Sequence, residues 1–584
     1  MRALVYVLAL FGMAATAARA EIRPEFAMDR DPLVTAPDPV FLFPDNVLSL
    51  WLQALARPEA EMQRLAAETI SQAQAYGLPD IQSAQPALLK IVAGESTHPA
   101  ARFAAARALI VLEAKDAANV LFESSQKNGS DLRQLIEPAL AKWKFEPAQR
   151  VWQKRLITPA THLRELVLAI RCARESGDAS CVESLLAIAL DPHRPVSARF
   201  EAARSAGALR NAGLEETARR FLNSAGATPF PRLCAVALLD RHRSLPAQTE
   251  MLRLAVDAEP SVAAAALISL NANDPSLVVP IAEQAMRNDD ANVRQQGVSA
   301  YVALPTPARV VAMTPLLDDP HSGLRGALRE SLFQLAKTPE LDTPIREAAS
   351  AVLARDGWRG QEQAALLLAA LDHKPAAARC VALLESPRDE VLIATAWALR
   401  LLAVRETLPA ILDKVARQTE FRKKSTARPS LDFQVAHLCE ALGLMKYAPA
   451  DGLLRSYIPK NMILGEQSRS AAIWALGHLY AKQPDEGLAK LLFERLTDPS
   501  INPPELESVR IMSVVSMARM KTRTQSEPTR KHLLAQTPPE SMNMVFRWAI
   551  QEMTGEKLPE PKPAVETRFG WFLEPLEVKS NAAK

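Results

Sequence analysis

The chain has 584 residues, of which 48% are hydrophobic and only 5% aromatic, and its formal net charge is +3. This near neutrality excludes binding of nucleic acid or anionic lipid through global charge, so electrostatic recognition requires local patches. Glycine is scarce, with 20 residues, which favours close-packed helices over sheets.

Residues 1–20 have the pattern of a secretory signal peptide. Arg2 supplies the positive charge, residues 4–11 form the apolar core, and residues 18–20 (Ala-Arg-Ala) form a small-x-small cleavage site. The apolar core is shorter than the ~20 residues of a membrane-spanning helix, which disfavours an uncleaved anchor. We therefore expect an exported protein, periplasmic or extracellular. Its mature chain would begin at Glu21 with a charge of +1, because two arginines and no acid are removed.

Residues 21–46 carry five prolines. Proline removes a backbone donor and is excluded from helix interiors, so we expect an extended N-terminal arm. Phe41, Leu42 and Phe43 would let this arm lie on the first helices as a cap, and free disorder is the alternative.

Helical segments follow over residues 47–555 and recur with a period of 31 residues. Residues 99–112 and 196–209 are two copies of the first helix of a unit, and residues 181–190 are a leucine-rich second helix. Self-similarity at this period predicts a solenoid, in which each unit buries its apolar face only against its neighbours. Many units open on an arginine, and these repeat arginines include Arg102, Arg133, Arg164, Arg232, Arg294 and Arg325.

The joints between units carry aspartate, often followed by proline. Aspartate accepts from free amides at a helix start, and proline is tolerated in the first turn. Because an acid and an arginine recur at similar places, we expect a hydrogen-bonded ladder along the stack, in which the arginines are structural. The joints are Asp191-Pro192, Asp289-Asp290, Asp318-Asp319-Pro320 and Asp498-Pro499.

The pattern D-P-x-x-x-[VL]-R-x-x-A-x-x-[AS]-L is matched best at 318–332 and more loosely at 191–209 and 498–517. It resembles the HEAT family in its short bacterial version, also seen in HEAT-like repeats of the phycobiliprotein-lyase type. The resemblance covers roughly residues 47–555 and implies an all-α solenoid of about fourteen antiparallel helix pairs. Solenoids are usually binding surfaces, so it also favours a scaffold over an enzyme.

Residues 556–584 form a proline-rich C-terminal tail. Its Trp571 and Phe572 are expected to dock on the last helices as a cap, and a partner-binding peptide is the alternative.

The sequence contains no constellation that predicts catalysis, a metal site or a cofactor site. The nine histidines include no HExxH pair, and GxSxG, P-loop and GxGxxG motifs are absent. Five cysteines form no CxxC motif. In an exported protein Cys172 and Cys181 could pair, and the alternative is that all five cysteines fill gaps in helix packing.

Three basic clusters remain, near residues 142–155, 417–428 and 519–531. HEAT-like folds include a DNA glycosylase family, but export and near neutrality argue against nucleic acid. The middle cluster is expected in a long inter-helix loop, and insertions in solenoids often lie on a binding face. A solvated loop is the alternative. The candidate partner-binding residues are Arg417, Arg422, Lys423, Lys424 and Arg428.

The leading hypothesis is an exported, non-enzymatic scaffold that binds a protein partner on the concave face of the solenoid. An accessory module for an anionic polymer, in the envelope or outside the cell, is the alternative. An enzyme is the third hypothesis, and no residue supports it. No cofactor, metal, nucleic acid or integral membrane segment is expected.

Overall fold

The computed structural model describes residues 22–223, 228–424, 430–567 and 570–574. The chain forms two compact units. The N-unit contains residues 39–300 and the segment from 564 onward, and the C-unit contains residues up to 38 and 301–563. The boundary at residues 300 and 301 lies within one helix, α16 (Ala291–Ala303).

The described residues form thirty α-helices and two three-residue strands. The all-α solenoid of antiparallel helix pairs predicted from the repeat is therefore confirmed, with about fifteen pairs in place of about fourteen. The N-unit contains β1 (Val40–Leu42), α1 (Val47–Leu55), α2 (Ala60–Ala75), α3 (Gln85–Ala93), α4 (Pro99–Val111), α5 (Ala118–Lys127), α6 (Ser130–Lys142), α7 (Glu146–Ile157), α8 (Leu163–Ser176), α9 (Val182–Leu190), α10 (Val196–Leu209), α11 (Glu215–Asn223), α12 (Phe230–Leu239), α13 (Leu245–Ala255), α14 (Pro260–Asn273), α15 (Ala282–Met286), most of α16, and β2 (Val565–Thr567). The C-unit contains the 3-10 helix η1 (Met28–Arg30), α17 (Pro307–Met313), α18 (Ser322–Leu335), α19 (Pro339–Ala354), α20 (Trp358–Ala370), α21 (Ala377–Leu383), α22 (Asp389–Leu402), α23 (Leu408–Lys424), α24 (Ser430–Leu444), α25 (Asp451–Arg455), α26 (Glu466–Leu479), α27 (Glu486–Leu496), α28 (Glu507–Met520), α29 (Ser526–Gln536) and α30 (Met544–Thr554).

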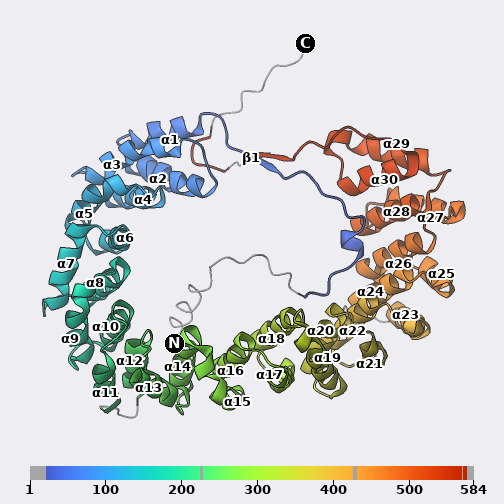
Figure 1. Cartoon of the computed structure of the whole chain (residues 1–584). Helices are drawn as coiled ribbons and strands as arrows, with labels where there is room; N and C mark the ends of the chain where they lie inside the picture. The colour runs from blue at the N-terminus through green and yellow to red at the C-terminus, as the bar shows by residue number, and fades with distance from the viewer. Residues whose placement is uncertain (1–21, 224–227, 425–429, 568–569, 575–584) are drawn as a thin grey trace. The chain divides into compact units, whose positions relative to one another are not determined.

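Within each unit the helices form two layers. The even-numbered helices pack on one another in sequence order, and we call them the even layer. The odd-numbered helices cover their other side and form the odd layer. In Figure 1, taken one unit at a time, the even layer lines the concave side of the stack.

The even layer is tight because small residues stand where neighbouring helices meet. A Cβ atom added to Gly443 in α24 would lie 2.5 Å from the Cα atom of Ala475 in α26. In the N-unit, a Cβ atom added to Gly207 in α10 would lie 2.1 Å from the carbonyl oxygen of Ala237 in α12. Backbones therefore approach at distances that no side chain larger than hydrogen allows.

The repeat arginines are structural, as expected, and Arg232 forms a contact of the predicted ladder, since its Nε atom lies 3.1 Å from the Asp257 carboxylate at the next joint. Arg325 donates to the carbonyl oxygens of Asp319 and Pro320 at 2.6 and 3.1 Å. The Asp319 carboxylate accepts from the His321 amide at 2.8 Å, and Asp498 accepts in the same way from the Ser500 amide. Arg325 thus bonds carbonyls of the joint, while each of these aspartates bonds an amide two residues later in the same joint.

The C-terminal segment docks on the first helices, so the expectation that it caps the last helices is wrong. Strand β2 pairs in parallel with β1, with Val565 opposite Val40. The Trp571 ring centroid lies 5.8 Å from that of Trp51 in α1 and 5.5 Å from that of Phe43. The Trp51 indole N–H donates to the Phe572 carbonyl oxygen. These contacts close the apolar end of the N-unit.

All five cysteines are buried and free, so Cys172 and Cys181 do not pair. Among the described residues, no helix has both the length and the apolarity to cross a bilayer. Within the same part of the chain, no three His, Cys, Asp or Glu side chains are grouped so that they could hold a metal ion.

Candidate functional site: the N-terminal arm on the even layer of the C-unit

Residues 22–34, which we call the docked arm, lie along the even layer of the C-unit. Figure 1 shows this segment in blue beside α24, α26 and α28. Its first contact is with α18, where the Ile22 amide donates to Glu330 at 3.0 Å. Its later contacts are with α22, α24, α26 and α28. The arm therefore crosses five even-numbered helices in the order in which they are stacked.

Charged side chains of the even layer bind the backbone of the arm. Arg400 in α22 donates to the Glu25 carbonyl oxygen at 2.7 Å. The Met28 amide donates to Glu440 in α24 at 2.9 Å. Such charge-assisted hydrogen bonds are stronger than those between neutral groups.

Two apolar side chains anchor the centre of the arm. Phe26 is 8% exposed, and its ring centroid lies 4.4 Å from that of His437 and 5.7 Å from that of Phe433, both in α24. Met28 is 3% exposed. Burial of such side chains drives docking through the hydrophobic effect.

Asp31 forms the polar end of the contact. Its carboxylate accepts from the Trp474 indole N–H at 2.8 Å, lies 2.9 Å from the His478 Nε2 atom, and pairs with Arg519 in α28. Burial alone would raise the pKa of Asp31. The hydrogen bond with His478 and the charge of Arg519 outweigh burial, so the pKa of Asp31 lies below its ordinary value.

Ionisable side chains beneath the arm are deeply buried and incompletely paired. His437 is fully buried, which lowers its pKa; its Nδ1 atom lies 3.5 Å from Glu440 Oε2, and beyond this long contact neither ring nitrogen has a hydrogen-bond partner among the described residues. Glu440 lies 3.3 Å from Arg400, yet its Oε2 atom and the Arg400 Nε atom also lack hydrogen-bond partners there. Buried polar atoms without partners are rare in native proteins and call for an explanation.

The arm does not fill the surface on which it lies. An open groove of about 610 Å³ remains between the arm and helices α18, α20 and α22. Phe333, Trp397, Arg400 and Leu401 line its helix side, and Phe26 lines its arm side. Arg23, Glu25 and Arg30 also line its arm side, so the groove combines an apolar helix side with charged groups around it.

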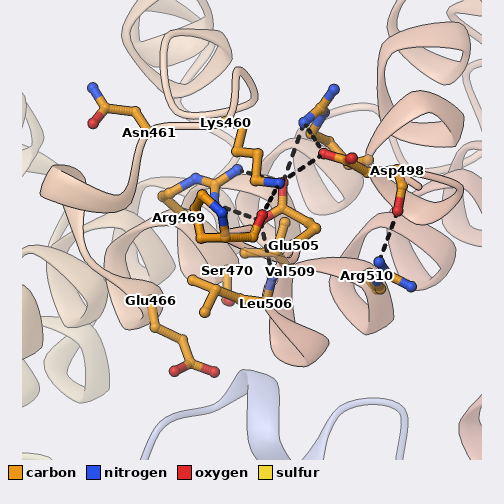
Figure 2. Close-up of polar contacts among 12 residues, drawn as sticks. Lys460, Asn461, Glu466, Arg469, Ser470, Asp498, Glu505, Leu506, Val509 and Arg510 are labelled. Carbon is orange, nitrogen blue, oxygen red and sulfur yellow. Dashed lines mark hydrogen bonds and ion pairs between the residues drawn. The ribbon is translucent and has the colours of Figure 1, made fainter. Parts of the chain in front are cut away.

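A second polar cluster lies where α26 meets the segment before α28 and holds the layer together (Figure 2). Arg469 and Glu505 are fully buried and bonded at 2.7 and 3.0 Å. Burial raises the pKa of Glu505, but the hydrogen bonds of Arg469 outweigh it and the net shift is downward. Lys460 lies 3.3 Å from Asp498. Because its charges are matched, we assign this cluster a structural role.

The predicted partner-binding residues do not converge on one surface. Helix α23 continues to Lys424, so most of the expected loop is helical because its apolar residues follow the helical period. Arg422 is buried and donates to Ser468 and Asp432 at 2.6 and 3.0 Å. Arg417 pairs with Glu385 and Asp413, and Lys423 pairs with Glu420. Lys424 is exposed, and Arg428 lies outside the described residues. Partner binding by these residues stays a prediction.

The residues that hold the arm were missed by the sequence analysis, although one signal was present. Gln434, His437 and Glu440 recur at a spacing of three in a stretch of α24 that is otherwise apolar after Asp432; His437 and Glu440 contact the arm, whereas Gln434 donates to the Leu384 carbonyl oxygen. This spacing places them on one helix face, and polar residues there indicate a face that contacts something other than the apolar core.

No protein-family model matches the chain, and no curated protein matches it by sequence. Solved structures match it by fold. A structure of Kap95p with RanGDP has a TM-score of 0.51 and 13% identity, covering 87% of this chain and 72% of Kap95p. A Kap121p mutant has a TM-score of 0.50 and 12% identity, covering 87% of this chain and 56% of Kap121p. Kap121p bound to Pho4p also has a TM-score of 0.50, with 10% identity, and covers 87% of this chain and 57% of Kap121p.

These likenesses establish the fold, an α-solenoid of HEAT-like helix pairs, and the chain spans just over half the length of Kap121p.

Proposed function

We propose that the protein is an exported, non-enzymatic scaffold that binds a segment of a protein partner on the concave even layer. The observation that carries this proposal is the docked arm. The even layer of the C-unit holds a segment whose only helix is the single 3-10 turn η1, through backbone hydrogen bonds from Arg400 and to Glu440 and through a buried aromatic ring at Phe26. A surface that holds one peptide in this way has the chemistry to hold another.

Two further observations support a binding role. Structures of similar fold include Kap121p bound to Nup53p and to Pho4p, so this architecture binds protein partners in those cases. The buried cysteines are poor nucleophiles, because burial raises the pKa of Cys181, Cys234 and Cys380 to about 12 and keeps the thiols protonated.

Export rests on the signal-peptide pattern of residues 1–20. The expected result of fractionation is a mature chain that begins at Glu21, identified by N-terminal sequencing of the exported fraction. A chain retained in the cytoplasm with Met1 intact would contradict this part of the proposal.

The binding face can be tested by site-specific photo-crosslinking. A photoreactive residue in place of Leu401, which lines the groove on α22 and is 39% exposed, is expected to capture a partner from the exported fraction at low and high salt. The matched control is Leu491 on α27 of the odd layer, which is 43% exposed. Capture only from Leu491 would place binding on the odd layer. If neither position captured a partner, and no partner were retained on a column carrying the protein, the scaffold function would be overturned.

A further inference from the structure

We infer that residues 22–31 are an exchangeable internal ligand, which occupies the even layer in place of a partner segment that carries an aromatic residue and, five positions later, a carboxylate. This inference rests on the proposed function and adds the chemistry of the partner and its competition with the arm.

The even layer recognises the arm at separate positions along its length. The ring of Phe26 packs on Phe433 and His437, and the carboxylate of Asp31 is bound by groups of α26 and α28. The layer also binds the backbone at Glu25, before Phe26, and at Met28, whose side chain is buried. An aromatic side chain and, five residues later, a carboxylate are the two side chains with specific contacts, so a competing segment must supply them.

The arm does not satisfy all the buried polar atoms of the layer beneath it. Beneath the arm, the His437 Nε2 atom and one Glu330 oxygen have no hydrogen-bond partner in the described part of the chain, and the Glu440 Oε2 atom has only long contacts, at 3.5 Å from His437 Nδ1 and 3.3 Å from Arg400. A segment selected only to seal the fold would leave an apolar surface there, because unpaired buried polar groups cost stability. Donors and acceptors on a partner segment would satisfy these atoms.

The fit is also incomplete in volume. The groove of about 610 Å³ beside Phe26 is bounded by Phe333, Trp397 and Leu401. With the arm in place Leu401 is still 39% exposed and Phe333 is half-buried, so a bulkier partner segment that covered them would gain hydrophobic free energy over the arm.

The arm can leave without unfolding an α-helix, because its only helical element is the 3-10 turn η1. After Asp31 the chain continues through Pro32 and the exposed Leu33, and it reaches the first solenoid helix only at Val47. The tether keeps the arm at a high effective concentration, so a partner must outcompete it. The apparent affinity of the wild-type chain for a partner is then the intrinsic affinity multiplied by the fraction of molecules in which the arm has left the layer.

The test uses a fluorescent peptide of residues 22–34 (IRPEFAMDRDPLV) added to the full mature chain, with binding followed by anisotropy. We expect the peptide to bind the F26A/D31N variant at least tenfold more tightly than the wild-type chain, because the weakened arm leaves the layer free. Leu33→Ala is the matched control, since Leu33 is 87% exposed, and it should behave as wild type. A peptide carrying Asp31→Asn should bind the double variant at least tenfold more weakly.

Equal affinity for the wild-type chain and the double variant, or no binding to either, would overturn the internal-ligand inference. Thermal melting of the double variant shows whether it is folded, and Asp31→Asn alone gives a milder second variant. Failure here is distinguishable from failure of the scaffold function. Peptide exchange without partner capture at Leu401 would sink the scaffold function alone, whereas capture at Leu401 without peptide exchange would sink the internal ligand alone.

Discussion

The two units are built from the same repeat, yet their even layers bury different side chains. In the N-unit, helices α4, α10 and α14 bury mainly alanine, leucine and valine. In the C-unit, helix α24 also buries Gln434, His437 and Glu440, and helix α26 buries Arg469 between two serines. The polar set in α24 occurs where the docked arm crosses the layer.

This difference separates two roles of the repeat. Small apolar residues at helical spacing are sufficient to stack helices, because each helix buries its face against the next. Polar residues inside such a layer destabilise it unless another group pairs with them. Buried charges such as Glu137 in α6 and Arg469 in α26 are paired within the solenoid, so the incompletely paired polar residues of α24 are the ones that mark where the arm is bound.

The largest effect that we expect is on the unfolding free energy. It compares loss of the buried ion pair of the C-unit with loss of an arginine's hydrogen bonds in the N-unit. Arg469→Ala leaves Glu505 buried without its main partner, and we expect a loss of about 3–5 kcal/mol in the unfolding free energy of the C-unit. Arg102→Ala in the N-unit removes bonds to the Gly94 carbonyl and Asn128, and should cost about 1.5–3 kcal/mol.

Urea titration read by hydrogen exchange and mass spectrometry reports each unit separately. The control replaces both charges, as Arg469→Met with Glu505→Met, and should recover part of the loss because no unpaired charge remains. A loss below about 1 kcal/mol for Arg469→Ala would show that the buried pair adds little to the C-unit.

The next effect tests a feature that the units share, the close approach of even-numbered helices. Gly443→Ala should cost about 1–3 kcal/mol although alanine favours helix, because its Cβ atom would overlap Ala475. Gly207→Ala should behave alike in the N-unit. Gly326 in α18 is the matched control, since a Cβ atom there meets nothing within 4 Å, and Gly326→Ala should stabilise by about 0.5–1 kcal/mol. Chemical denaturation of the three variants checks this order, and a stabilising Gly443→Ala would contradict it.

The fold was predictable from the sequence, because stacking depends on local periodicity and on small residues within each 31-residue unit. The site was not, because the arm and its partners are distant in sequence: Asp31 and Arg519 are separated by 488 residues. Nothing near Phe26 distinguishes it from other residues of a proline-rich segment. Arg422 was predicted to bind a partner, but it is buried within the solenoid. Its hydrogen-bond partners Ser468 and Asp432 are 46 and 10 residues away in sequence, so the sequence alone does not reveal them.

A smaller effect concerns acidification. Burial lowers the pKa of His242 in the N-unit, and of His373, His437 and His532 in the C-unit. A histidine with a lowered folded pKa contributes stability above its unfolded pKa of about 6.5, and this stability is lost as the pH falls towards the folded value. We therefore expect the C-unit to lose more stability than the N-unit between pH 7 and pH 5.

His437→Gln should reduce the pH dependence of the stability of the C-unit, because it removes a buried histidine with a lowered pKa. Among the four histidines, His437 is the one that packs against Phe26, and it lies beside Glu440. Asp31 behaves differently: its pKa is lowered too, so its contribution to docking is lost only as the pH falls below about 4. Thermal melts at several pH values check both statements. An unchanged slope in His437→Gln would show that His437 is not the group that titrates.

The smallest expected effect is that of reversing the exposed charges on α23, and it decides between partner and polymer binding. Lys423→Glu with Lys424→Glu should leave stability almost unchanged, because both lysines are exposed and surface ion pairs contribute little. Arg422→Glu is unsuitable for this purpose, since it would bury an acid beside Asp432. Lys127→Glu at the end of α5 in the N-unit is the matched control.

If the docked arm marks the binding surface, retention of an anionic polymer on a column at low salt should be equal for the wild type, the α23 double variant and the Lys127→Glu control. A fall in retention confined to the α23 variant, and abolished at high salt, would favour the polymer-binding module instead. In that case recognition would depend on a few exposed cations on the odd layer, and the polar residues beneath the arm would serve the stability of the C-unit alone.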